Sequence, residues 1–291
     1  MTDQPTSTPL IDAHMHVGRL YATEAKALTP RFLLDFMDRS GIERAVLLPI
    51  ESPEECHYYV TTREVLAVCR RHGGRFIPFC NVDPRIGDGD NTATLRARLA
   101  EHKRAGCKGY GEAMTGLAID DARLQRVYGI CGEFELPVLF HMDGERNLDA
   151  PGLPGLERML QAFPRTVFIG HAQHFWAEIS GDASAAQFGT YPAGPIAPGG
   201  AVARLLADYP NLYADISAGS GLNALTRDPA FALRFLERFQ DRLLFGTDIC
   251  RRVREIGNVA WLRGAAARGE ISPQTFRKIA RDNAISVLQL E

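Results

Sequence analysis

The sequence has no long hydrophobic run and no excess of positive charge. Its 291 residues carry 33 Lys and Arg against 35 Asp and Glu, a formal net charge of −2. Without a basic stripe to neutralise phosphates, we expect no nucleic-acid partner. A membrane-spanning helix needs about 20 apolar residues in a row, and residues 1–9 are polar and lack the apolar core of a targeting signal. We therefore expect a cytoplasmic protein with no membrane partner.

The sequence also has few cysteines, and none of them forms a Cys-x-x-Cys pair. Because most lie within apolar patterns, we interpret them as reduced, structural thiols rather than zinc ligands or disulfides. Cys250 lies two residues after Asp248, a candidate site residue, but we interpret it too as a bystander. The six are Cys56, Cys69, Cys80, Cys107, Cys131 and Cys250.

No internal repeat, low-complexity tract or linker divides the chain. A chain that is 45% hydrophobic over this length can bury a large core. We therefore predict one domain over residues 1–291. The longest break in pattern runs from about 179 to 200 and is rich in Gly and Pro. It is a lid over the mouth, a source of subunit contacts, or a rigid surface loop.

Short β-rich runs alternate with amphipathic helical patterns along the whole chain. This order predicts an α/β protein, either a single (β/α)₈ TIM barrel or a doubly wound open sheet. Candidate ligands follow five of the strands, and they would meet at one mouth only in a closed barrel, which we favour. The predicted strands span residues 10–13, 44–50, 75–82, 106–112, 137–141, 166–171, 212–217 and 243–247.

Two histidines mark the end of the first predicted strand. Residues 11–16 read Ile-Asp-Ala-His-Met-His, and side chains two apart on a strand point to the same face. His14 and His16 are therefore aimed at one point, which suits a divalent metal. Later strand ends supply further candidate ligands, which are Glu112, His141, His171 and Asp248. We expect Asp12, inside the strand, to hold a histidine or a backbone group instead.

These motifs together resemble the metal-dependent amidohydrolase superfamily. The resemblance rests on His14-Met-His16, on His141 in Leu-Phe-His-Met-Asp, on His171 in Phe-Ile-Gly-His-Ala-Gln-His and on Asp248 in Leu-Phe-Gly-Thr-Asp. The closing Arg-Asp-Asn-Ala at 281–284 is similar to the last helix of the branch with small-molecule hydrolases and decarboxylases. The resemblance implies a TIM barrel with one or two divalent ions, held by His14, His16, His141 and Asp248.

The fourth strand departs from the superfamily pattern, in which a modified lysine often bridges two metals. Lys108 and Glu112 share a face here but lie about 13 Å apart at ~3.3 Å per residue. Glu112 is nearer the carboxyl end, so we expect it to bridge two ions, or else to bind substrate or a histidine. We expect Lys108 lower in the barrel, paired with a carboxylate. His171 is then either a ligand of a second ion or a catalytic donor beside a single one.

Imidazole and carboxylate donors suit zinc, our first choice, and also manganese, iron, cobalt or nickel. Our first hypothesis is a hydrolase of a small-molecule amide, lactone or ester, in which metal-bound hydroxide attacks a carbonyl and Asp248 transfers the proton. The main alternative is a decarboxylase or hydratase with His171 or Asp248 as proton donor. A non-catalytic ligand-binding barrel and a phosphoesterase rank lower.

Substrate recognition is harder to place in the sequence. Arg251 and Arg252 closely follow Asp248, and guanidinium groups match carboxylates. They suggest a substrate with an anionic group, or else simply a charged start to the next helix. Weaker candidates are His57, His174 and Trp176. The partner we expect is a small molecule, and a homo-oligomer is left open.

Overall fold

A computed structural model describes residues 8–19, 26–87 and 89–291. The described chain alternates strands and helices, and all paired strands run parallel. Each of the predicted strands overlaps an observed one, but most observed strands are shorter. The strands are β1 (Leu10–Met15), β2 (Ile42–Leu47), β3 (Phe76–Pro78), β4 (Tyr110–Ala113), β5 (Val138–His141), β6 (Phe168–His171), β7 (Leu212–Asp215) and β8 (Leu243–Leu244).

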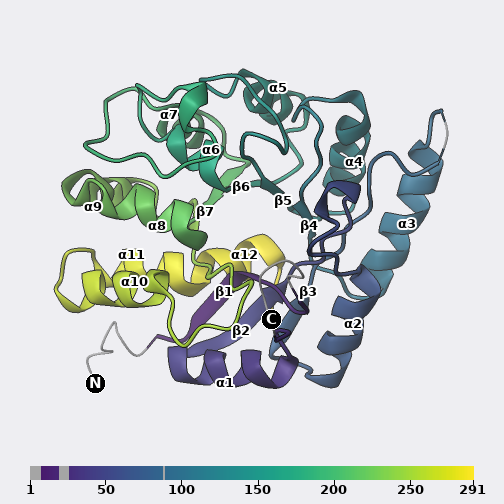
Figure 1. Cartoon of the computed structure of the whole chain (residues 1–291), viewed down its shortest axis with the longest axis horizontal. Coiled ribbons are helices and arrows are strands. Elements are labelled where there is room, and N and C mark those ends of the chain that lie inside the picture. The colour runs from purple at the N-terminus through teal and green to yellow at the C-terminus, as the bar shows by residue number, and fades with distance from the viewer. Residues whose placement is uncertain (1–7, 20–25, 88) are drawn as a thin grey trace.

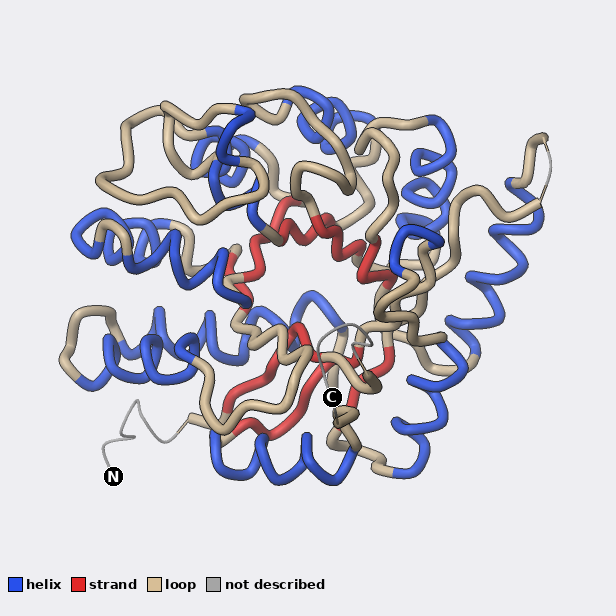
Figure 2. Tube along the Cα trace, in the orientation of Figure 1, coloured by secondary structure: helices blue, strands red, loops and turns tan. Residues whose placement is uncertain are grey.

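The strands close into a barrel rather than an open sheet. They pair in the orders β1-β2-β3 and β4-β5-β6-β7-β8, and two further contacts join these groups. A parallel bridge links Cys80, after β3, to Tyr110 in β4, and another links Met15 in β1 to Ile249 after β8. Figure 2 shows the resulting ring of strands inside a shell of helices. The chain is a TIM barrel, so the carboxyl ends of its strands converge on one mouth.

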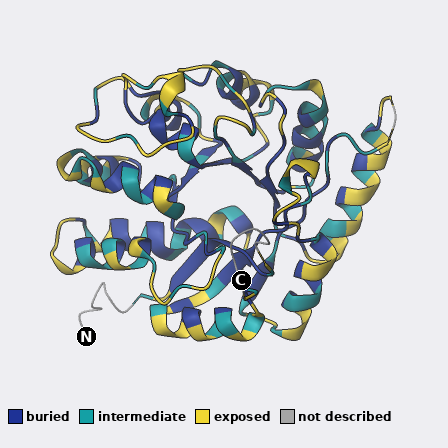
Figure 3. Cartoon of the chain, in the orientation of Figure 1, coloured by how far each residue is buried: buried dark blue, intermediate teal, exposed yellow. Residues whose placement is uncertain are grey.

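The helices form the outer layer of the barrel (Figure 1). Figure 3 shows that their outward faces are exposed while the strands are buried. They are α1 (Pro30–Ser40), α2 (Thr62–Arg71), α3 (Thr92–Arg104), α4 (Ala122–Glu133), α5 (Pro154–Ala162), α6 (Gln173–Ala177), α7 (Ala201–Asp208), α8 (Ala218–Thr226), α9 (Pro229–Arg238), α10 (Gly257–Ala267), α11 (Pro273–Arg277) and α12 (Asn283–Leu288). Two 3-10 helices, η2 (Pro53–Glu55) and η3 (Ala185–Gln187), and a π-helix, η4 (Lys278–Asp282), complete the described set. Among the described helices, none is long and apolar enough to cross a membrane.

Local capping chemistry explains where several helices begin. Asp121 precedes α4, and its carboxylate accepts the main-chain N–H of Arg123 at 2.8 Å, as a helix cap should. Thr61 and Glu64 form a reciprocal capping box at the start of α2. These caps fix the residues at which α2 and α4 begin. They therefore also fix where the preceding loops at the mouth end.

Two hydrophobic layers hold the barrel together. A large cluster lies between the strands and the helices, and a smaller one fills the barrel interior. Ala284 and Leu288 of α12 join the inner cluster, so the last helix closes the amino end of the barrel. The polar mouth lies at the other end. The inner cluster contains Ile11, Ala13, Val46, Leu48, Ile77, Phe79, Leu139, Ile169 and Leu244.

Strand β1 changes register just before the mouth. Ile11 and Ala13 belong to the inner cluster, and strict alternation would then turn His14 and His16 away from it. An irregularity in the pairing with β2 between Asp12 and Met15 interrupts that alternation. Such irregularities re-aim side chains next to active sites, and here both histidines end up at the mouth.

Candidate metal centre

The side chains at the carboxyl ends of five strands meet in one cluster. His14 and His16 come from β1, Glu112 from β4, and Asp248 from the turn after β8, while His141 and His171 end β5 and β6. Three overlapping groups of these residues place donor atoms within 4.8 Å of one another. The structure thus brings together all six residues that the sequence proposed as ligands. Their role as ligands is our proposal.

Four donor atoms form one group, in which a carboxylate oxygen of Glu112 and one of Asp248 each lie close to the Nε2 atoms of His14 and His16. The Nε2 atoms of His14 and His16 lie 3.1 Å apart. Glu112 Oε2 is 3.4 and 3.2 Å from them, and Asp248 Oδ1 is 3.4 and 3.3 Å from them. Neighbouring ligands that each lie about 2 Å from a zinc ion are about 3.3 Å apart, so each of these five distances suits two ligands of one ion. The same spacing also suits adjacent ligands of a larger octahedral ion, so the donor set fits a divalent metal without selecting one.

The ring nitrogens that face away from this point are held by hydrogen bonds. His14 Nδ1 is 2.7 Å from Asp215 Oδ2, and His16 Nδ1 is 3.2 Å from the carbonyl oxygen of Leu48. Both partners accept, so both Nδ1 atoms carry the hydrogen, and each Nε2 lone pair is free for a ligand. Outer partners of this kind orient histidine ligands in metal sites.

The second carboxylate oxygen of Glu112 faces a different histidine. Its Oε1 is 2.7 Å from His141 Nδ1 and 3.9 Å from His171 Nε2. His141 Nε2 in turn is 3.1 Å from Asp143 Oδ2, which Arg146 also contacts at 2.9 Å. Glu112 therefore lies between the histidine pair of the four-donor group and a second group with His141 and His171. This geometry allows either one ion or two with Glu112 as the bridge.

His171 lies between two carboxylates. Its Nδ1 is 3.1 Å from Asp215 Oδ2, and its Nε2 is 3.6 Å from Asp248 Oδ2. Asp248 thus directs Oδ1 toward the histidine pair and Oδ2 toward His171. The backbone at Asp248 has a φ of 52°, a left-handed conformation that Asp tolerates better than most residues and that often occurs at functional sites.

Opposite charges control the protonation of the cluster. Burial alone lowers the pKa of His14, but the charges of Asp248 and Glu112 raise it well above its usual value. Burial opposes ionisation of Glu112 and Asp248, yet the neighbouring histidines hold the pKa of both carboxyls below the usual range. The same balance of burial against Asp143 and Glu112 raises the pKa of His141 to about 9. The ionised carboxylates favour a cation, for which protons compete at the histidines.

Asp12 has the supporting role that we expected from the sequence. It is fully buried, and its Oδ1 accepts the main-chain N–H of His14 and of Thr247, both at 2.9 Å. Its Oδ2 accepts the Thr247 hydroxyl at 2.5 Å. Asp12 therefore joins β1 to the turn after β8. The expectation for Lys108 was wrong in one respect, because its Nζ donates to the carbonyl oxygen of Gln289 at 3.1 Å rather than to a carboxylate.

The candidate substrate residues are more scattered than the candidate ligands. Arg251 and His57 are exposed. The guanidinium of Arg252 lies over the Phe32 ring at 5.0 Å and donates to the carbonyl oxygen of Ala27, which directs it toward α1.

The two candidates after β6 are buried. Trp176 Nε1 donates to the carbonyl oxygen of Asp215 at 2.9 Å, so Trp176 supports the end of β7. The His174 ring is fully buried against Phe188, with ring centroids 3.3 Å apart. Phe188 belongs to the long connection between α6 and α7, and this connection is therefore packed onto α6.

Sequence reasoning missed two residues around the cluster, Asp215 and Asp143, and gave a third, Tyr58, only as a weaker substrate candidate. Asp215 contacts both His14 and His171, Asp143 contacts His141, and the buried Tyr58 ring lies 5.5 Å from the His16 ring. Asp215 ends a predicted strand, a position that could have marked it. Asp143 lies two residues after His141, in a motif already singled out, and Tyr58 follows the second predicted strand.

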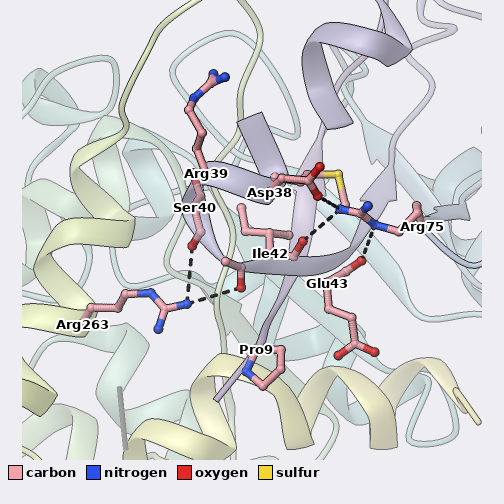
Figure 4. A pocket seen from close by; sticks show the side chains of 10 residues that line it. Pro9, Asp38, Arg39, Ser40, Ile42, Glu43, Arg75 and Arg263 are labelled. Atoms are coloured by element: carbon pink, nitrogen blue, oxygen red, sulfur yellow. Dashed lines mark hydrogen bonds and ion pairs between the residues drawn. The ribbon is translucent and has the colours of Figure 1, made fainter. Parts of the chain in front are cut away.

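A hollow at the surface lies at the opposite end of the barrel from this chemistry. This hollow of about 780 Å³ lies at the amino ends of β1 and β2 and is lined by residues such as Pro9, Asp38 and Ile42. Figure 4 shows Arg75 and Arg263 there, bonded to main-chain oxygens of neighbouring residues. TIM-barrel active sites lie at the carboxyl end of the strands, so this hollow is not our candidate site.

Comparison with known proteins agrees with the fold and shows the family. The family model described as amidohydrolase matches residues 11–290. The chain therefore belongs to the amidohydrolase family, whose resemblance the sequence motifs had indicated. A comparison with curated proteins found no significant match.

Solved structures share the architecture at low sequence identity. An uncharacterized TIM-barrel protein from Bordetella bronchiseptica has a TM-score of 0.68 at 18% identity, with 97% of this chain and 99% of that chain covered. A probable 2-pyrone-4,6-dicarboxylic acid hydrolase from Acinetobacter baumannii, with citric acid bound, has a TM-score of 0.63 at 13% identity, covering 97% and 100%. A 5-carboxyvanillate decarboxylase from Novosphingobium aromaticivorans, complexed with manganese and a nitrobenzoic acid, has 0.63 at 14%, covering 99% and 98%. At these identities the likeness shows the fold.

Proposed function

We propose that this chain is a metal-dependent hydrolase of a small-molecule amide, lactone or ester. The observation that carries the proposal is the position of Asp248. One of its oxygens completes the four-donor group, the other faces His171 Nε2 at 3.6 Å, and its side chain is 20% exposed while the other three donors are almost fully buried. Asp248 is thus the member of the group that a substrate can reach.

The donor set assigns a role to each residue. His14, His16, Glu112 and Asp248 would hold the ion, with zinc as our first choice. A bound divalent ion would polarise a carbonyl oxygen and acidify a water molecule. Asp248 Oδ2 then accepts a proton from the water and passes it to the leaving group. His171, with its Nδ1 hydrogen on Asp215, presents Nε2 to the same space and stabilises negative charge on the substrate when protonated.

The alternative within the family is a decarboxylase. It is supported by the fold shared with the decarboxylase from N. aromaticivorans and by the pair of His171 and Asp248, because such a reaction needs a proton donor at the carbon that loses carbon dioxide. The fold shared with the probable hydrolase supports our first choice. The partly exposed side chain of Asp248 favours hydrolysis in our proposal, because its second oxygen can relay a proton from water to a leaving group.

A paired screen tests the proposal. The protein is loaded with zinc or manganese and given lactones, esters and amides in a pH-stat, and aromatic and unsaturated carboxylic acids with detection of carbon dioxide. We expect turnover in the first panel, lost at least a hundredfold in Asp248→Asn. The matched control is Arg204→Ala, which removes a half-exposed arginine paired with Glu157 on the outer surface. Carbon dioxide release alone would assign the alternative, and silence in both panels would refute catalysis of either kind.

A further inference from the structure

Asp215 is held from several sides at the end of β7. It is fully buried. Its Oδ2 lies 2.7 Å from His14 Nδ1 and 3.1 Å from His171 Nδ1, and it accepts the Ser217 hydroxyl at 2.7 Å. Its Oδ1 accepts the Ser217 main-chain N–H at 2.9 Å. One carboxylate oxygen thus contacts the rings of two histidines, one at the end of β1 and the other at the end of β6.

The geometry points to Asp215 as a shared positioning residue that orients a metal ligand and the proton-transfer histidine from a single oxygen. Asp215 Oδ2 only accepts hydrogen bonds. The Ser217 hydroxyl also lies 3.2 Å from His171 Nδ1, but it donates its hydrogen to Oδ2 and so offers His171 an acceptor. Both Nδ1 atoms therefore carry hydrogen. Both Nε2 atoms then face the cluster, where His14 binds the ion and His171 faces Asp248. The ring centroids of the two histidines are 4.4 Å apart, so neither ring can turn without disturbing the other.

The other two histidines of the cluster do not depend on Asp215. His16 Nδ1 uses the carbonyl oxygen of Leu48, and His141 uses Glu112 and Asp143. Removing the acceptor at Asp215 should therefore change the Nδ1 hydrogen bonds of His14 and His171 and leave those of His16 and His141 in place. The assignment of proton transfer to His171 rests on the proposed function, but the selective dependence of the two rings does not.

The substitution Asp215→Asn tests this selectivity. Ser217 N–H needs an acceptor at Oδ1, so the amide nitrogen of Asn takes the place of Oδ2 and faces two N–H donors. The measurement is proton–nitrogen NMR of protein labelled with ¹⁵N-histidine, with chelator present, which detects hydrogen-bonded ring N–H groups. We expect the Nδ1–H signals of His14 and His171 to be lost or to move strongly, while those of His16 and His141 stay in place.

Asp12→Asn is the matched control. It makes the same chemical change at another fully buried carboxylate near His14 that contacts backbone and Thr247 rather than a histidine ring. We expect all four ring signals to persist. Zinc affinity, measured by competition with a chromogenic chelator, should fall about 10- to 100-fold in Asp215→Asn and less in the control.

Three results would overturn the inference. They are movement of only one of the two rings, movement of neither, or an equal effect in the control. Where Asp215→Asn does not fold, Ser217→Ala replaces it, because it removes one of the hydrogen bonds that hold Oδ2. Because this variant also removes the contact of the Ser217 hydroxyl with His171 Nδ1, we then expect shifts at His14 and His171 and none at His16 or His141. A shift of His16 as large as that of His171 would refute the proposal. A chain that is catalytically silent still gives these signals, so failure of the proposed function is told apart from failure here.

Discussion

Replacing Asp12 by Asn should stabilise the ion-free protein in a pH-dependent way. Complete burial raises the pKa of Asp12 to about 7, against hydrogen bonds from Thr247 and His14 that lower it. Asn keeps the geometry of the protonated acid, because its carbonyl oxygen still accepts the N–H groups of His14 and Thr247 while its amide can donate to the Thr247 hydroxyl. The variant thus removes an ionisation that burial makes costly.

The size of the effect follows from proton linkage. Between about pH 4 and pH 7 the folded wild-type protein binds more protons at Asp12 than the unfolded chain does, so its free energy of unfolding falls as the pH rises. With a folded pKa of about 7, this residue contributes roughly 2 kcal/mol more at pH 5.5 than at pH 8. Asn has no such term. The stability of the variant relative to the wild type should therefore rise by roughly 2 kcal/mol from pH 5.5 to pH 8.

Urea unfolding of both proteins at these two pH values, with chelator present, measures the difference. Because every other titrating group is common to the two proteins, subtraction isolates Asp12. Asp12→Ala serves as a comparison, since it deletes the hydrogen bonds and should destabilise at both pH values. A difference between Asn variant and wild type that stays constant or falls as the pH rises would refute the argument.

Three further predictions concern the ion and the loops. Zinc affinity, measured by calorimetry, should fall steadily as the pH drops from 8 to 5.5, because protons compete with zinc at His14 and His16. Burial lowers the pKa of both histidines, but the nearby carboxylates outweigh it and raise the pKa. A constant affinity would contradict this prediction. Arg252→Ala should change KM less than twofold, since its guanidinium is directed toward α1, and a tenfold rise would show that it binds substrate. Phe188→Ala should accelerate proteolysis of the connection between α6 and α7, because it removes the ring stacked on His174, whereas unchanged cleavage would show that this contact does not hold the connection.

Sequence patterns were sufficient for the barrel and for the cluster at its mouth. Alternating strands and helices limit the fold to two classes, and the polar residues at the strand ends favour the closed one. The closing contacts from Cys80 to Tyr110 and from Met15 to Ile249 agree with this choice. His14, His16, Glu112, His141, His171 and Asp248 were all identified because each ends or follows an apolar strand.

What the sequence could not give depends on long-range contacts. Asp215 is 201 positions from His14, and nothing local indicates that one oxygen would serve two rings. The register irregularity in β1 depends on pairing with β2. The direction of the Arg252 side chain depends on α1, because its guanidinium packs on Phe32 of that helix. The two residues are far apart in the sequence and meet only in the folded chain. Charge and spacing alone had placed it near a substrate.

The metal content of the purified protein tests the central claim most directly. The protein is prepared without a histidine tag, equilibrated with zinc or manganese, and analysed by elemental mass spectrometry beside Glu112→Gln and the double variant His14→Ala/His16→Ala. We predict one or two equivalents per chain in the wild type and near-complete loss in the double variant. Two equivalents that fall to one or fewer in Glu112→Gln would identify Glu112 as the bridge. No metal in the wild type, or unchanged metal in the double variant, would contradict the assignment of this cluster as a metal centre.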